Sequence, residues 1–405
     1  MKARHIDPAR AQYAVALQDP FIKGAAGGVL PRPLPADIIS DDLNFLDPLN
    51  LHFASPFALV SWGQYLRGQP KGAPGIIGAR DRTKTTILGD SGGYQFIGNP
   101  TLYEGASTAR RSVAWLESNT DLAMTLDIPT RAINPAGRWT SYEDCLADTL
   151  TNLGAITDRR GSASTRFLNV LQGRDLAECR HWYKAVKDYP FEGWAFGDQS
   201  RQLPIMLELV ARMVDEDRVG SHLHVLGSSS MTRAVELTAL KRALAAKGIK
   251  VEITFDTATP SIMAANNQLV SWLKASSKEL VSGVLPLAVD PDLRDQHLSF
   301  PVPETFVGSR VDMADLIVRG GTAQSGIDAV SHLLLTHHNI EQSHRLIEQA
   351  NRVVDLAAYR TDMAPAALLL RLKDIGKFLT RADPKKYISG HLGGFSEPLD
   401  PERSE

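Results

Sequence analysis

The chain has 405 residues, of which 43% are hydrophobic and 22% are charged, and this globular composition excludes a disordered or fibrous chain. The 44 Lys and Arg against 46 Asp and Glu give a net charge of −2, which excludes a protein that coats nucleic acid with positive charge. Cys145 and Cys179 are too few for a disulfide framework. No apolar signal core begins the chain and no apolar run approaches about 18 residues, which predicts a cytoplasmic protein without membrane contact.

Short apolar runs alternate with longer amphipathic stretches over most of the chain. The first 75 residues are rich in Pro and Gly, and only residues 49–66 stand out there as a segment expected to pack against the main core. Later apolar runs end at a polar residue or a glycine: Asp90, Asp127, Gln172, Asp198, Gly227 and Asp256. Each interval between these ends has room for one strand, one helix and two short loops.

The intervening stretches carry helix signals. Ser141 and Asp144 form a capping box that predicts the start of a helix, and Gly248 predicts the end of another over 231–248. Residues 107–119 and 175–189 are also predicted helices. Six β/α units, with flanking material for two more, predict an α/β fold, a (β/α)8 TIM barrel. A doubly wound open sheet is the alternative, although no dinucleotide or P-loop motif is present.

The character of the chain changes at about residue 322. Two long helical segments follow, and they predict a C-terminal helical appendage over 322–405, after a barrel domain with an N-terminal extension over 1–321. Residues 384–405 are polar and rich in Gly and Pro, so we expect them to be frayed.

Active sites of such barrels lie at the C-terminal ends of the strands, where this sequence places four aspartates and Gln172. Convergent carboxylates fit three chemistries: divalent metal binding, glycosidic bond chemistry, or recognition of a ligand rich in hydrogen-bond donors. Four arginines follow these strand ends and are candidates for phosphate binding: Arg131, Arg138, Arg174 and Arg201. Helix capping and solvated loop charges are the alternatives for each of these residues taken singly.

The segment Asp90-Ser91-Gly92-Gly93-Tyr94-Gln95 is the most specific motif. It resembles the signature hexapeptide of the tRNA-guanine transglycosylase superfamily. Five further segments are similar to motifs of that superfamily, in the same order: Met124–Asp127, Val170–Gly173, Gly193–Gly197, Val225–Gly227 and Phe255–Pro260.

This resemblance implies an enzyme that exchanges guanine in nucleic acid for a 7-deazaguanine by double displacement. It implies that Asp256 is the nucleophile and Asp90 the general acid and base. It further implies that other residues bind the base by hydrogen bonds to its edge, by packing on its faces or by close approach of the backbone. These residues are Ser91, Gly92, Gly93, Tyr94, Asp127, Gln172, Gly197, Asp198, Leu226 and Gly227.

Two departures from the superfamily bear on the substrate. The tRNA enzymes hold a structural zinc through three cysteines and a histidine, whereas this chain has no cysteine after Cys179. We therefore expect neither zinc nor another cofactor, and we expect a surface helix to carry the histidines 332, 337, 338 and 344. In addition, Asp198 replaces a glycine.

A zinc-less relative resembles the DNA-guanine transglycosylase branch, which inserts 7-cyano-7-deazaguanine into DNA within a modification and restriction system. This resemblance implies DNA as a partner, together with other proteins of that system, including an ATPase. Three alternatives remain: a tRNA-guanine transglycosylase of the queuine or archaeosine type without zinc, a non-catalytic nucleic-acid-binding accessory subunit, and a metal-dependent barrel hydrolase.

Overall fold

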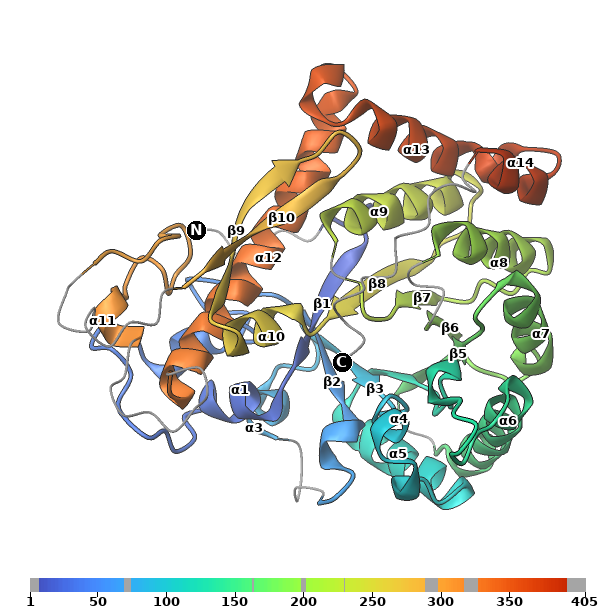
Figure 1. Cartoon of the computed structure of the whole chain (residues 1–405), viewed down its shortest axis with the longest axis horizontal. Helices are drawn as coiled ribbons and strands as arrows, with labels where there is room; N and C mark the ends of the chain where they lie inside the picture. Colours follow the sequence, from blue (N-terminus) through green and yellow to red (C-terminus); the bar gives the residue numbers. More distant parts are fainter. Residues whose placement is uncertain are drawn as a thin grey trace.

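The computed structural model describes residues 7–68, 74–161, 164–197, 202–228, 230–287, 298–316 and 327–391. Eight parallel strands close into a barrel in chain order, with β1 pairing to β8 as well as to β2 (Figure 1). The predicted α/β barrel is thus confirmed. Its strands are β1 (Gln12–Leu17), β2 (Phe57–Ser61), β3 (Thr86–Asp90), β4 (Leu122–Met124), β5 (Arg166–Leu171), β6 (Gly193–Phe196), β7 (His222–Val225) and β8 (Glu252–Thr257).

The N-terminal region supplies the two strands that the sequence left unassigned. β1 and β2 both lie within the Pro- and Gly-rich first 75 residues. The segment 49–66 contains β2, so part of it belongs to the barrel wall and does not merely pack against it.

Helices surround the barrel (Figure 1). The capping box of Ser141 and Asp144 forms as predicted, because the Ser141 hydroxyl accepts from the Asp144 N–H at 3.2 Å and the Asp144 carboxylate accepts from the Ser141 N–H at 3.1 Å. The helices up to residue 316 are α1 (Asp19–Gly24), α2 (Ser40–Leu43), α3 (Gly75–Ala79), α4 (Gln95–Gly98), α5 (Ala106–Asn119), α6 (Tyr142–Arg159), α7 (Leu176–Val186), α8 (Leu203–Asp215), α9 (Met231–Ala246), α10 (Thr259–Ala265) and α11 (Met313–Leu316).

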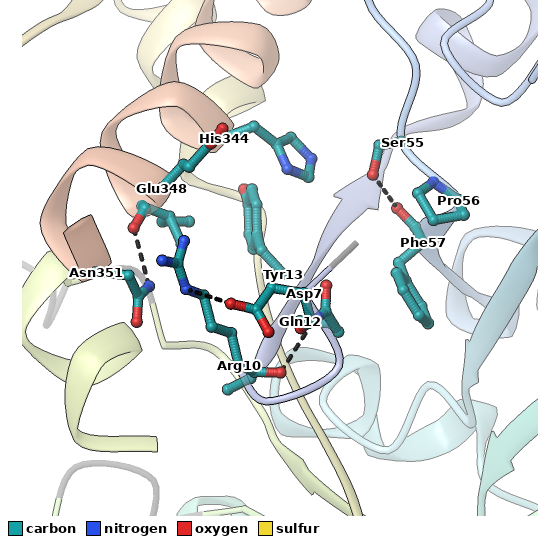
Figure 2. A pocket seen from close by; sticks show the side chains of 12 residues that line it. Asp7, Arg10, Gln12, Tyr13, Ser55, Pro56, Phe57, His344, Glu348 and Asn351 are labelled. Carbon is teal, nitrogen blue, oxygen red and sulfur yellow. Dashed lines mark hydrogen bonds and ion pairs between the residues drawn. The ribbon is translucent and has the colours of Figure 1, made fainter. Parts of the chain in front are cut away.

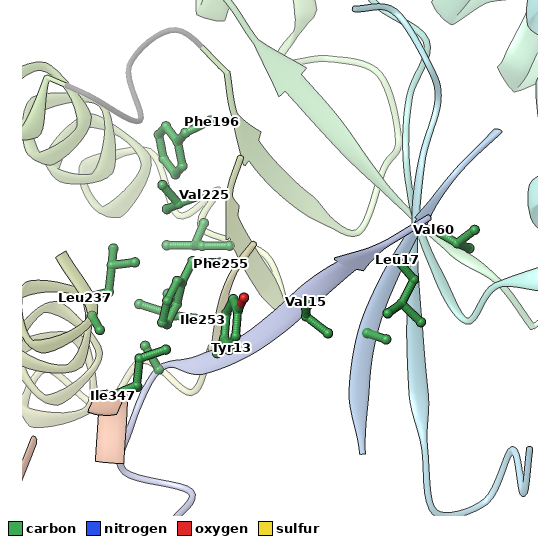
Figure 3. Close-up of a cluster of buried hydrophobic side chains, with 14 of the residues drawn as sticks. Tyr13, Val15, Leu17, Val60, Phe196, Val225, Leu237, Ile253, Phe255 and Ile347 are labelled. Carbon is green, nitrogen blue, oxygen red and sulfur yellow. The ribbon is translucent and has the colours of Figure 1, made fainter. Parts of the chain in front are cut away.

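The strands separate two buried layers, because alternate residues of a strand point to opposite faces. Outward side chains pack against the helices, as Figure 3 shows for Tyr13 and Phe255 beside Ile347. Inward side chains form a smaller cluster: Ala14, Ala16, Leu59, Leu88, Leu122, Met124, Leu168, Val170 and Ala195, with Phe57, Leu226 and Ala258 at its edge. The barrel is therefore filled by side chains and is not a pore.

An antiparallel hairpin follows the barrel and was not predicted. Its strands are β9 (Gln268–Ala275) and β10 (Leu280–Pro286). The hairpin packs on α10 and on α12 (Ala329–Ala357), to which Asn339 ties it by accepting from the Val270 N–H at 2.8 Å (Figure 1).

The C-terminal part is helical, as predicted. After α12 come α13 (Ala366–Lys377), which packs on α9, and α14 (Pro384–His391), which packs on α8 (Figure 1). Residues 384–391 are thus helical, contrary to the expectation of a frayed end, because α8 gives them a surface to pack on. The expected boundary between residues 321 and 322 lies outside the described residues. In the described part of the chain, no helix is long and apolar enough to cross a membrane.

The histidines of α12 are not on a surface. His337 and His338 are fully buried and His344 is nearly so, whereas His332 is only partly buried. The surface-helix prediction is therefore wrong. The physical reason is non-local: α12 lies beneath aromatic side chains from distant segments, including Phe53 and Phe306, which contact the ring of His337.

Candidate active site at the C-terminal mouth of the barrel

Two aspartates stand at the C-terminal ends of strands on the same side of the barrel mouth. Asp90 is the last residue of β3, and Asp256 is the residue before the last of β8. The strands β1 and β2 separate them in the sheet, and the negative charge of Asp256 acts on Asp90. The two carboxylates therefore belong to one electrostatic site, as expected for residues at strand ends of a barrel.

Asp90 lies in surroundings that disfavour its charge. Burial raises the pKa of Asp90 above its ordinary value, and the negative charge of Asp256 adds to this rise. Hydrogen bonds from the Ser61 hydroxyl, at 2.6 Å, and from the Gly92 N–H oppose it. A carboxyl group with a raised pKa in a half-buried mouth is suited to hold and release a proton.

Asp256 has two hydrogen-bonding partners on one oxygen. The Gly227 N–H donates to its Oδ1 at 3.0 Å, and the Nε2 of His224 lies 3.2 Å from the same oxygen. Asp256 is 6% exposed and His224 is fully buried. This arrangement holds the carboxylate in one orientation and leaves its Oδ2 for other contacts.

Asp127 and Gln172 form the second polar pair of the mouth. Gln172 Nε2 donates to Asp127 Oδ2 at 2.7 Å, and both side chains are buried. Gly197 makes room for this pair, since a Cβ at residue 197 would come within 2.4 Å of Gln172 Nε2. An acceptor and a donor held side by side can read a ligand edge that carries a donor next to an acceptor.

The turn after β3 has the tight geometry that its glycines permit. Gly92 has φ +81, and a Cβ there would lie 2.6 Å from the Gly63 backbone. Ser91 is buried and donates to the Thr125 carbonyl at 3.1 Å, so the turn is fastened to the end of β4, and Gly93 packs against Asp127. Tyr94 is 65% exposed and is therefore not a core residue.

The remaining predicted base contacts are placed unevenly. Leu226 is half-buried at the edge of the inward cluster, and Gly227 is exposed beside it with φ +64. Asp198 and Arg201 lie outside the described residues.

The described arginines of the rim are already engaged. Arg138 pairs with Asp148 at 3.5 Å and lies over the ring of Tyr103, 4.6 Å from its centroid. Arg174 pairs with Glu178. Arg131 is exposed and also interacts within the protein. Phosphates would thus compete with existing partners for these side chains.

Neither of the following two hollows in the described part of the chain is lined by the paired carboxylates. The first is an open rim groove between the starts of α6 and α7, lined in part by Thr140, Arg174 and His181. The second lies at the opposite end of the barrel, where Figure 2 shows the starts of β1 and β2 facing α12. Arg10, which lines it, forms an ion pair with Asp7 at 3.1 Å.

Sequence reasoning missed the residues that support the two aspartates. Ser61 ends β2 and contacts Asp90, while His224 of β7 and Thr254 of β8 lie beneath Asp256. A signal was present, because His222 and His224 alternate with Leu223 in a buried strand and so both face the barrel interior.

Within the described ranges, no group of three or more His, Cys, Asp or Glu side chains is arranged to hold a metal ion. A scan against protein-family models found no match to this chain, and a search of curated proteins found no similar sequence.

Proposed function

We propose that this chain is a guanine transglycosylase that replaces guanine in DNA by a 7-deazaguanine, 7-cyano-7-deazaguanine, through a covalent aspartyl-glycosyl intermediate. The observation that carries the proposal is the pair of carboxylates at one barrel mouth, with the pKa of Asp90 raised and Asp256 held by two donors. Such a pair in unlike surroundings suits one proton donor and one nucleophile.

In the first displacement, Asp256 attacks the anomeric carbon while the glycosidic C–N bond breaks, and Asp90 donates a proton to the departing guanine. In the second, the incoming base loses a proton to Asp90 and its nitrogen attacks the same carbon. The carbon–oxygen bond to Asp256 then breaks and its electron pair returns to the carboxylate. Two inversions retain the anomeric configuration.

The second polar pair supports a guanine-like substrate. Asp127 would accept hydrogen bonds from the N–H groups of the base, and the neighbouring Gln172, with the backbone near Gly197, would donate to its carbonyl oxygen. Tyr94 has the exposure needed to cover one face of a base that enters the mouth, and Leu226 would cover the other.

The choice of DNA follows from the resemblance and from the missing cysteines, not from a contact in the fold. A guanine stacked in duplex DNA must be flipped out before its glycosidic bond can be attacked, at a cost of a few kcal/mol. Assistance from an ATPase of the same modification system would fit that requirement. The rim groove near Arg174 is the candidate path for the nucleic-acid backbone.

The test follows the base and the adduct together. DNA and tRNA with labelled guanine are incubated with the protein and 7-cyano-7-deazaguanine, and released label and a denaturation-resistant adduct are measured. We expect both from DNA, and neither from the Asp256→Asn variant. Asp188→Asn is the matched control, since Asp188 is exposed and lies in the loop after α7.

Each alternative has its own outcome in this assay. Label released from tRNA alone would assign the zinc-less tRNA enzyme in place of the DNA enzyme. Nucleic-acid binding without release or adduct would favour an accessory subunit. Activity that a chelator abolishes would favour a metal-dependent hydrolase.

A further inference from the structure

A row of polar side chains crosses the barrel interior along β7 and β8. His222, His224, Thr254 and Asp256, called the polar row below, share the inward face with Leu226 and Ala258. The Nε2 of His222 and the Nδ1 of His224 each lie 2.7 Å from Thr254 Oγ1, and the Nε2 of His224 lies 3.2 Å from Asp256 Oδ1. All four residues are buried. The row therefore connects the start of β7 to one oxygen of the Asp256 carboxylate.

Hydrogen-bond chemistry gives the row a direction. An ionised Asp256 only accepts, so the Nε2 of His224 must carry a proton. Burial lowers the pKa of His222 well below its ordinary value, and this ring is therefore neutral at pH 7. If His224 is neutral as well, its Nδ1 accepts from the Thr254 hydroxyl, whose oxygen accepts from the Nε2–H of His222. With both rings neutral, no other arrangement satisfies all three contacts.

The polar row differs from what a barrel interior needs for packing alone. Inward positions of other strands carry Ala14, Leu88, Leu168 and Val170, which fill space without any polar group to satisfy. Buried polar groups cost free energy unless every donor and acceptor is paired, and apolar replacements of similar volume are often no worse for stability. Histidines directly below Asp256 are therefore explained better by a need of that carboxylate than by packing.

We propose that His224 is a positioning residue for the nucleophile, held in its required tautomer by Thr254 and His222. This inference rests on the proposed function. His224 and the Gly227 N–H fix Oδ1 of Asp256, so that Oδ2 forms the bond to the anomeric carbon. Oδ1 becomes the carbonyl oxygen of the glycosyl ester and keeps both donors. When the carbon–oxygen bond breaks in the second displacement, the same donors stabilise the charge that returns to Asp256.

The experiment measures the rates of adduct formation and breakdown with a guanine-containing oligonucleotide. His224→Phe removes the donor but retains an aromatic ring, and we expect both rates to fall roughly 10- to 100-fold with KM unchanged. His224→Gln restores a donor and should recover most of the loss. Thr254→Val leaves His224 in place but removes the donor to its Nδ1, and it should give a smaller loss. His391→Ala, in exposed α14, should match the wild type.

A second measurement does not depend on activity. In protein labelled with ¹⁵N-histidine, we expect the His224 signal of the wild type to show a protonated Nε2 and an unprotonated Nδ1. An unprotonated Nε2 would overturn the positioning role, even where His224→Phe fails to fold. The positioning role would also be overturned if His224→Phe formed and broke down the adduct at the same rates as the wild type. A wild type without any adduct would instead overturn the proposed function, and the role of His224 with it.

Discussion

The two aspartates of the mouth stand above very different parts of the barrel interior. Below Asp90, the buried inward side chains of β3–β5 are apolar and form what we call the apolar wall: Leu88, Leu122, Met124, Leu168 and Val170. Below Asp256 lies the rest of the polar row, whose groups hydrogen-bond to one another. The Asp90 carboxyl group thus lies above apolar side chains, whereas the Asp256 carboxyl group lies above polar side chains that are hydrogen-bonded to one another.

This difference separates what the two carboxyl groups can do. Desolvation favours the protonated form of Asp90, whose pKa is raised. The Gly227 N–H and the His224 ring both contact Oδ1 of Asp256 and fix the orientation of its carboxylate. Two carboxyl groups in such unlike surroundings can serve at the same pH as a proton donor and as a nucleophile. The predictions below test that separation, from the largest expected effect to the smallest.

Asp90→Asn removes the proton donor but keeps the size of the side chain. We expect the rate of guanine release to fall roughly 10²- to 10⁴-fold, because the leaving base no longer receives a proton. Release of labelled guanine from DNA measures this effect, with Asp188→Asn as the control. A release rate within a few fold of the wild type would show that Asp90 is not the proton donor. The apolar wall and the polar row would then have no distinct roles.

Local signals made the six later β/α units readable from sequence. The apolar run of each unit ends in a polar residue or a glycine, and Ser141 and Gly248 mark helix ends by local chemistry. β1 gave no such signal, because its pairing to β8 joins residues far apart in the chain.

Burial and side-chain partners depend on distant segments, and the sequence could not supply them. His337 looked like a surface residue of a helix, but Phe21, Phe53 and Phe306 from separate segments contact its ring. For the same reason the contact of His224 with Asp256 was missed, although both strands were predicted.

Leu168→Ala opens a cavity in the apolar wall. Leu168 is fully buried, and we expect the free energy of unfolding to fall by about 2–5 kcal/mol, as measured by urea denaturation. Leu370→Ala is the control, since Leu370 is 57% exposed on α13 and should change stability little. Equal losses in the two variants would show that the wall is not a packed core.

His337 of α12 offers a contrast to the polar row, because it is a fully buried histidine whose ring packs among aromatic side chains. Neither ring nitrogen of His337 has a hydrogen-bond partner among the described residues. Burial lowers its pKa to about 3, and the positive charges that His338 and His52 can carry add to this. The unfolded chain binds a proton at the ordinary histidine pKa of about 6.5, so stability is complete above that pH and falls as the pH drops towards 3.

His337→Phe removes the group whose protonation in the unfolded chain lowers stability at acidic pH. The wild type should lose about 2 kcal/mol through His337 between about pH 7 and pH 5, and the variant should lose that much less. Urea denaturation at the two pH values measures the difference. His391→Phe, at an exposed position, should keep the wild-type pH dependence. A variant as acid-sensitive as the wild type would show that His337 can be protonated in the folded protein.

Ser61→Ala tests the hydroxyl group that donates to Asp90 and lowers its pKa, and we expect it to have the smallest effect of these variants. Because the Ser61 hydroxyl stabilises the charged form of Asp90, its loss should raise the pKa of Asp90 further. In the proposed mechanism, adduct formation requires protonated Asp90, so the decline of its rate at high pH should move upward by roughly one pH unit. Rates measured across pH check the shift, with Ser118→Ala on exposed α5 as the control. A decline that stays in place or moves to lower pH would mean that another group governs it, and Asp90 could then not be the acid.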